Sequence, residues 1–368
     1  MDEVRSDPND AVSVAFVSDS MPERNGVGAY YADLIAQLDP GEFDARFLCP
    51  GGQIRGGLHF PLPGDATQQV YLPSPRAFAR AMKDLLPDAV VVATPGPFGM
   101  LGARWARKLG ARLIFGFHTD YAGVTDLYQR SVLKVFSRGY FRVVDRMLFK
   151  RADHVLANSA AMIAQAERMG ARRVSRIGTL LPKSVLETPV RVSDGAFGQV
   201  LFAGRLAPEK RLHTVVEAAE AHPGIRFVIA GEGPQKSEIE AAAARLQNLD
   251  YVGWLSREGL CAQMDAADAL LLPSEMESFG NVALEAMGRG RIAVVTDTCG
   301  IGNWPALAEH MVVFGLQQSL SDVLSDLACW PDERRAELAR RAEQAARTLN
   351  RESLDQWREL LGSPVLSG

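Results

Sequence analysis

The sequence predicts an α/β protein with two doubly wound, Rossmann-like domains, each built on a parallel sheet. Short apolar runs alternate with helix-forming segments along almost the whole chain, which is the pattern of such sheets. The 368 residues are 47% hydrophobic, enough for two domains with ordinary cores. Residues 191–198 interrupt this pattern with small and polar residues, so they are predicted to be the linker.

The predicted organisation has five parts. Residues 1–10 are acidic and polar, which indicates a disordered leader and not a signal peptide. The N-terminal domain covers 11–190, the linker 191–198 and the C-terminal domain 199–335. Residues 336–368 form a terminal helix, the main part of a long charged stretch that begins near residue 332.

Composition excludes several classes of protein. Charged residues make up 23% and the net charge is −4, which gives no support to nucleic-acid binding. The four cysteines show no C-x2-C spacing, so reduced thiols and a cytoplasmic location are expected. No apolar run approaches the roughly 18 residues of a membrane span. A soluble protein is therefore predicted, at most peripheral on the inner face of a membrane.

The N-terminal half contains two candidate ligand-binding positions at strand ends. Strands are predicted at 12–17, 43–49, 89–94, 112–117 and 152–159, with helices between them, and residues 50–75 are predicted to be irregular. The loop Asn25-Gly26-Val27-Gly28 follows the first strand, and His118 follows the fourth. Parallel sheets bind ligands at the carboxyl ends of their strands. A single His in this position is also compatible with a structural role.

Residues 130–151 have a basic and an apolar side. Basic residues recur every four positions with apolar residues between them, and the segment carries seven basic residues and one acid, Asp145, a net +6. One interpretation is attachment to anionic lipid headgroups. The other is a helix packed on the core with a solvated basic face. The sequence leaves both open.

Anion-binding groups follow the strands of the C-terminal half. A strand at 199–203 leads into Gly204-Arg205-Leu206-Ala207-Pro208-Glu209-Lys210, so Arg205 and Lys210 can reach the same anion. A strand at 225–230 ends at Gly231, and Trp254 follows the strand near 251.

Residues 274–287 place two carboxylates around a helix start. An apolar strand at 269–272 precedes the loop, Ser278 is predicted to cap a helix, and Glu277 and Glu285 lie eight residues apart. Gly280 allows a ligand close to the backbone, and the first-turn N–H groups favour a phosphate. This pattern predicts a pocket for a sugar phosphate or a nucleotide sugar, although two Glu near a helix start can also serve only the helix dipole.

The chain resembles family 4 glycosyltransferases, which are retaining enzymes with the GT-B fold. Four motifs carry the resemblance, in family order and over almost the whole chain: Asn25-Gly26-Val27, His118-Thr119-Asp120, Arg205 with Lys210, and Glu277 with Glu285. Two segments depart from the family pattern, at 177–183 and 296–302, where a Gly-Val-Asp turn and a Gly-Gly pair are common.

The resemblance implies a role for each site residue. It implies an N-terminal acceptor-binding domain and a C-terminal nucleotide-sugar domain that face each other across a cleft, with the terminal helix packing back toward the first domain. The expected catalytic residues are His118 near the transferred sugar, Arg205 and Lys210 on the diphosphate, and Glu277 on the donor sugar. The expected donor-binding residues are Asn25, Gly26, Val27, Gly231, Trp254 near the nucleobase, Ser278, Phe279, Gly280, Asn281, and Glu285 on the ribose hydroxyls.

The expected reaction moves a hexose from a nucleotide diphosphate sugar, UDP-hexose first and GDP-mannose second, to a hydroxyl acceptor. Similarity to glycolipid-forming members favours a membrane lipid such as diacylglycerol, with a polysaccharide or a small soluble acceptor as the alternative. The chain contains no D-x-D triplet, so no metal and no other cofactor is expected. Two alternative functions from other classes also use a nucleotide sugar. One is a nucleotide-sugar epimerase, and the other is a non-catalytic nucleotide-sugar-binding module.

Overall fold

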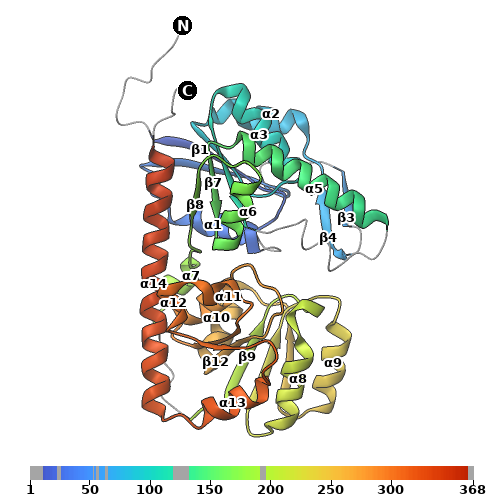
Figure 1. The fold of residues 1–368 in the computed structure, drawn as a ribbon, viewed down its shortest axis with the longest axis vertical. Coiled ribbons are helices and arrows are strands. Elements are labelled where there is room, and N and C mark those ends of the chain that lie inside the picture. Colours follow the sequence, from blue (N-terminus) through green and yellow to red (C-terminus); the bar gives the residue numbers. More distant parts are fainter. Residues whose placement is uncertain are drawn as a thin grey trace. The chain divides into compact units, whose positions relative to one another are not determined.

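The computed structural model describes residues 11–22, 26–52, 54, 58–62, 65–118, 132–190 and 196–363. Over these residues it contains two six-stranded parallel sheets with helices between the strands, which confirms the predicted α/β fold of two doubly wound domains (Figure 1). The predicted leader, residues 1–10, and most of the predicted linker lie outside the described residues.

The chain divides into two compact units, and the boundary between them differs from the one predicted from the sequence. Unit 1 comprises Met1–Gly178 and Ser353–Gly368, and unit 2 comprises Thr179–Glu352. The sequence places this boundary at residue 190. The difference arises because residues 179–189 are fixed to unit 2: Leu181 and Val185 are fully buried in its core. The buried Arg289 guanidinium also donates to the carbonyls of Thr188 and Pro189 at 2.7 and 2.9 Å.

Unit 1 is built on a parallel sheet of order β2-β1-β5-β6-β7-β8. Its six strands are short, and most of their residues are fully buried because helices cover both faces. In chain order its elements are β1 Val12–Val17, α1 Gly26–Gln37, β2 Phe43–Leu48, β3 His59–Leu62, β4 Asp65–Tyr71, α2 Pro75–Leu85, β5 Ala89–Val92, α3 Pro97–Leu109, β6 Arg112–Phe117, α5 Val132–Arg151, β7 His154–Ala157, α6 Ala160–Arg168 and β8 Val174–Arg176.

An antiparallel hairpin stands apart from that sheet. Strands β3 and β4 pair with each other and with no other described strand. They lie in the segment 50–75, so the prediction that this segment is irregular throughout is wrong. Its Gly and Pro residues suppressed the alternating pattern by which a strand is recognised.

Unit 2 is built on a second parallel sheet, of order β11-β10-β9-β12-β13-β14. Alternate residues of its strands enter two separate cores: Leu201 and Leu270 on one face, Val200 and Leu271 on the other. Its elements are α7 Lys183–Glu187, β9 Gln199–Ala203, η1 Pro208–Lys210, α8 Leu212–Ala221, β10 Arg226–Ala230, α9 Lys236–Arg245, β11 Leu249–Gly253, α10 Arg257–Ala266, β12 Ala269–Leu272, α11 Asn281–Gly288, β13 Ile292–Thr296, η2 Gly300–Asn303, α12 Pro305–Ala308, β14 Val312–Phe314 and α13 Leu320–Ala328. The last helix, α14 Asp332–Gly362, belongs to unit 2 up to Glu352 and to unit 1 from Ser353 on.

The end of α14 is anchored in unit 1. Trp357 and Leu361 on this helix are both fully buried. The Trp357 ring packs on Phe16 and Tyr31, and its indole N–H donates to the Tyr30 hydroxyl at 2.7 Å. The Arg112 guanidinium binds the carbonyls of Leu360 and Leu361, which would otherwise lack partners at the helix end.

The basic helix α5 uses its apolar side as core over the residues whose side chains are described. Val144, Leu148 and Phe149 are buried under the sheet, whereas Arg142 and Arg146 are exposed. Residues 130 and 131 and the side chains of 132–138 and Tyr140 lie outside the described part. The C-terminal half of the segment therefore matches the interpretation of a core-packed helix with a solvated basic face.

Trp357→Ala should destabilise the protein by about 3–5 kcal/mol, because it removes a fully buried ring and leaves a cavity. Urea unfolding measures the loss. Gln356→Ala, at the exposed neighbouring position, is the control and should change stability by less than about 0.5 kcal/mol. Equal effects of the two substitutions would contradict burial of Trp357.

Candidate active site

The loops after β9 and β12 meet at the carboxyl edge of the unit 2 sheet. The two strands are neighbours, and the N–H of Glu275 donates to the carbonyl of Glu209 at 2.8 Å. This bond ties the loop that contains Arg205 and Lys210 to the loop that contains Glu277. The sequence predicted each of these loops as a candidate binding segment, but it did not predict the contact between them.

A salt bridge joins two of the predicted catalytic residues. The Lys210 ammonium donates to the Glu277 carboxylate, and their side chains are 15% and 22% exposed. The Arg205 guanidinium lies 3.7 Å from the carboxylate of Glu209 on the same loop. Both cations are thus held at this edge by carboxylates, and both carboxylates can be exchanged for a stronger anion such as a diphosphate.

The helix after Glu277 begins later than predicted. Helix α11 starts at Asn281 and its N-cap is Gly280, which has φ +103°, so the prediction that Ser278 caps the helix is wrong. Gly280 takes this place because a residue with a side chain rarely adopts such a conformation. The N–H of Ala283 donates to the Gly280 carbonyl at 2.9 Å, whereas the N–H groups of Asn281 and Val282 have no intrahelical partner and remain suited to bind an anion.

The loop 277–280 is fixed by a segment that departs from the family pattern. The N–H groups of Gly300 and Ile301 donate to the carbonyls of Glu277 and Phe279 at 2.9 and 2.7 Å. The Phe279 side chain is buried with its ring on Trp304, so only its backbone is available to a ligand. The segment 296–302 therefore holds the backbone of the loop 277–280 in place, a role that its sequence did not indicate.

The other donor-binding candidates of unit 2 lie on the same edge or next to it. Gly231 has φ +135°, and a Cβ there would lie 1.8 Å from the carbonyl oxygen of Gly204, so no side chain fits. Trp254, one residue after β11, is 61% exposed. Glu285 is half-buried on α11, and the Asn281 side chain lies 3.5 Å from the Thr179 hydroxyl.

His118 is enclosed by aromatic residues at the carboxyl end of β6 in unit 1. Its Nε2 lies 2.7 Å from the Tyr31 hydroxyl, and the Tyr30 ring centroid lies 5.0 Å from its own. Burial lowers the pKa of His118 to about 4, so the imidazole is neutral near pH 7. The sequence gave no sign that the Tyr31 hydroxyl, on α1, meets His118.

Asp19 is a residue of this edge that the sequence reasoning missed. It follows β1, and its carboxylate accepts hydrogen bonds from the Thr94 hydroxyl at 2.7 Å and the Phe98 N–H at 2.7 Å. The Gly96 and Gly99 N–H groups donate to it as well, so it caps α3, whose own N-cap residue has no side chain. Burial raises the pKa of Asp19 to about 6 despite these bonds. The Gly96-Pro97 pair at the helix start was the available signal, because a Gly N-cap has no side chain and the capping group must come from another segment.

The Asn-Gly-Val motif is only partly described. Asn25 lies outside the described residues. Gly26 is the first residue of α1 and is exposed, and Val27 follows it in the first turn.

Two family models match the chain in succession. Glycosyltransferase Family 4 matches residues 24–179, and Glycosyl transferases group 1 matches residues 191–345. This chain belongs to glycosyltransferase family 4. It is a hexosyltransferase with the GT-B fold, and the resemblance drawn from its motifs is confirmed.

Individual relatives agree with that assignment. The chain is 34% identical to a 2-deoxystreptamine glucosyltransferase of Streptomyces kanamyceticus, over 62% of this chain and 67% of that protein. It is 25% identical to a GDP-mannose-dependent alpha-(1-6)-phosphatidylinositol dimannoside mannosyltransferase of Mycobacterium tuberculosis, over 82% and 81%. The fold of a sucrose-phosphate synthase from Thermosynechococcus elongatus is similar, with a TM-score of 0.68, 16% identity, and coverage of 95% and 98%.

His118 should make the stability of this glycosyltransferase depend on pH. Its folded pKa of about 4 lies below the ordinary value of 6.5, so the unfolded state binds more protons between these values. Stability should therefore fall as the pH drops from about 7 to about 5, by roughly 1–2 kcal/mol from this group. Urea unfolding of the wild type and His118→Gln at both pH values isolates the contribution as a difference. The exposed His213, changed to Gln, is the control; a pH dependence unchanged by His118→Gln would refute the buried, neutral imidazole.

Proposed function

We propose that this glycosyltransferase transfers a hexose from a nucleotide diphosphate sugar to a hydroxyl of a membrane lipid, with retention of the anomeric configuration. The observation that carries the proposal is the Lys210–Glu277 salt bridge, held between backbone-tied loops at the carboxyl edge of the unit 2 sheet. It supports the proposal because a cation suited to a diphosphate lies beside a carboxylate suited to sugar hydroxyls.

Donor binding would use charge exchange at this edge. The diphosphate would take Lys210 from Glu277 and Arg205 from Glu209, and the N–H groups at the start of α11 would bind its oxygens. The freed Glu277 carboxylate would accept hydrogen bonds from the donor sugar. Glu285 would bind the ribose, and the exposed Trp254 would lie beside the nucleobase.

The transfer step would need no protein base. The bond between the anomeric carbon and the diphosphate oxygen breaks, and the acceptor hydroxyl attacks that carbon from the side on which the diphosphate leaves. A phosphate oxygen takes the proton of the hydroxyl while Arg205 and Lys210 stabilise the leaving charge. The neutral His118 would donate to or accept from the transferred sugar without introducing a charge of its own.

We infer that these fixed cations take the place of a metal on the diphosphate, because the sequence contains no D-x-D triplet. Of the two donors, UDP-hexose is proposed first and GDP-mannose second. Glucose, a hexose, is the sugar named for one relative, and GDP-mannose is the donor named for the other.

A lipid acceptor is proposed on two grounds. One relative is named for transfer to a phosphatidylinositol dimannoside. In addition, the exposed Arg142, Arg146 and Lys150 of α5 can approach anionic headgroups. No helix among the described residues is long and apolar enough to cross a membrane. Transfer to a soluble acceptor is the alternative, and the aminocyclitol named for the other relative is an example.

Lys210→Ala and Glu277→Gln should each lower transfer by about 10²–10³-fold, as for the loss of one preorganised group at a developing charge. Release of nucleoside diphosphate, assayed with UDP-hexoses and GDP-mannose in the presence of a lipid extract, measures this. Lys236→Ala, which breaks an exposed ion pair in the same unit, should leave the rate within about twofold. Near wild-type rates in the first two variants, or activity lost with a chelator and restored by magnesium, would refute the mechanism.

Charge reversal on α5 tests whether this helix binds anionic membranes. Arg142→Glu with Arg146→Glu should weaken binding to vesicles containing anionic lipid by at least tenfold, because each basic residue contributes about 1 kcal/mol. Co-sedimentation measures it. The matched control is Arg76→Glu with Arg80→Glu, also exposed and also in unit 1, on α2. Equal binding of both double variants would exclude α5 as the membrane contact.

A further inference from the structure

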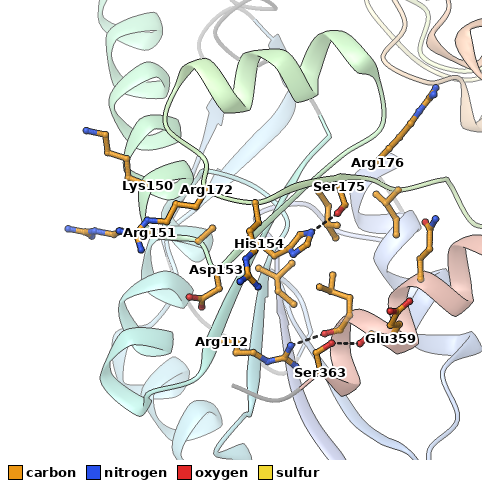
Figure 2. Close-up of a pocket in the computed structure, with 17 residues that line it drawn as sticks. Arg112, Lys150, Arg151, Asp153, His154, Arg172, Ser175, Arg176, Glu359 and Ser363 are labelled. Carbon is orange, nitrogen blue, oxygen red and sulfur yellow. Dashed lines mark hydrogen bonds between the residues drawn. The ribbon is translucent and has the colours of Figure 1, made fainter. Parts of the chain in front are cut away.

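A second polar pocket lies wholly within unit 1, at the other end of the strand that leads to His118. It has a volume of about 930 Å³ (Figure 2). Arg112, the first residue of β6, lines it, whereas His118 follows the last residue of the same strand. With about 3.3 Å per residue, these positions are roughly 20 Å apart. His118 itself is not among the residues that line the pocket.

The pocket floor is one face of the sheet near its β8 edge. Alternate residues of neighbouring strands form it: Ile114 and His154 are register partners, and so are Leu156 and Ser175. The His154 ring nitrogen and the Ser175 hydroxyl lie 2.8 Å apart and give the floor a polar centre. The end of α14, with Gln356 and Glu359, borders one side.

Basic side chains from several segments of unit 1 line this pocket. Figure 2 shows Lys150, Arg151 and Arg172 together at one margin, with Arg176 at the opposite one. The lining contains six basic side chains and two acidic ones: Arg112, Lys150, Arg151, Arg172, Arg173 and Arg176, against Asp153 and Glu359.

Few of these charges are neutralised locally. Within the described part of the chain, Lys150, Arg151, Arg172 and Arg173 make no ion pair. One oxygen of the Asp153 carboxylate already accepts from the N–H of Leu113, at 2.8 Å. Burial lowers the pKa of His154, and the charges of Arg173 and Arg112 lower it further.

We propose that this pocket binds a small organic phosphate with two or more negative charges. A hollow lined by one sign of charge concentrates counter-ions, and guanidinium groups match phosphate oxygens in pairs. Its volume is that of a site for a whole small molecule and exceeds what one phosphate ion needs. The phosphate can belong to a free metabolite or to a phospholipid headgroup. The site is independent of the transfer reaction, since none of its residues lies in the candidate active site.

The first test is binding of inorganic tripolyphosphate by calorimetry, in a chain that carries Arg205→Ala and Lys210→Ala so that the donor edge contributes little. We expect saturable binding that weakens at least tenfold on adding Arg172→Glu with Arg173→Glu. Arg172→Gln with Arg173→Gln should act in the same direction with less risk to folding, which thermal unfolding checks. Arg76→Glu with Arg80→Glu is the matched control and should leave the affinity unchanged.

A second readout places the ligand in the pocket. Tripolyphosphate should shift the NMR signals of the His154 ring and leave those of the exposed His213 in place. Absence of binding, affinity equal in the Arg172/Arg173 variants and the control, or shifts that spare His154, would each overturn the proposal.

Vesicles distinguish the two sources of phosphate. Phosphatidylcholine vesicles with and without phosphatidic acid are co-sedimented with the otherwise wild-type chain and its variants. Loss of the phosphatidic acid dependence in the Arg172/Arg173 variants assigns the pocket to a lipid headgroup. Tripolyphosphate binding without that dependence assigns it to a soluble phosphate. Vesicle binding that depends only on Arg142 and Arg146, with no tripolyphosphate bound, would overturn it.

Discussion

The contact between the loops after β9 and β12 is the constraint on which the donor site depends. Two neighbouring parallel strands end at the same edge, and one backbone hydrogen bond, Glu275 to Glu209, fixes the distance between their loops. Lys210 and Glu277 can then pair across that distance. In the proposed donor binding, the diphosphate would exchange these carboxylate partners for its own oxygens.

Groups outside the predicted site residues hold the loops and side chains of both units in place. Gly280 allows α11 to begin four residues after Glu277, and the backbone of Gly300 and Ile301 holds the intervening loop. In unit 1, the Tyr31 hydroxyl contacts the His118 ring and holds its orientation. The Asp19 carboxylate holds the loop before α3. Each of these groups acts on the position of a neighbour, which is why residue type alone did not reveal them.

The sheet of unit 1 has two chemically different ends. Its carboxyl end contains His118 among aromatic rings, where burial favours a neutral imidazole. Around the start of β6 and β7, basic side chains from several segments surround a polar hollow.

The sequence by itself determined the alternation of strands and helices, the family, and which loops contain Arg205, Lys210, Glu277 and Glu285, because these depend on local patterns and fixed spacings. Only the tertiary structure decided the helix start at Asn281, the division after Gly178, the core role of the α5 face around Leu148, and the partners of His118. These features depend on contacts between residues far apart in the chain, and no local pattern records which distant group will satisfy a buried charge or carbonyl.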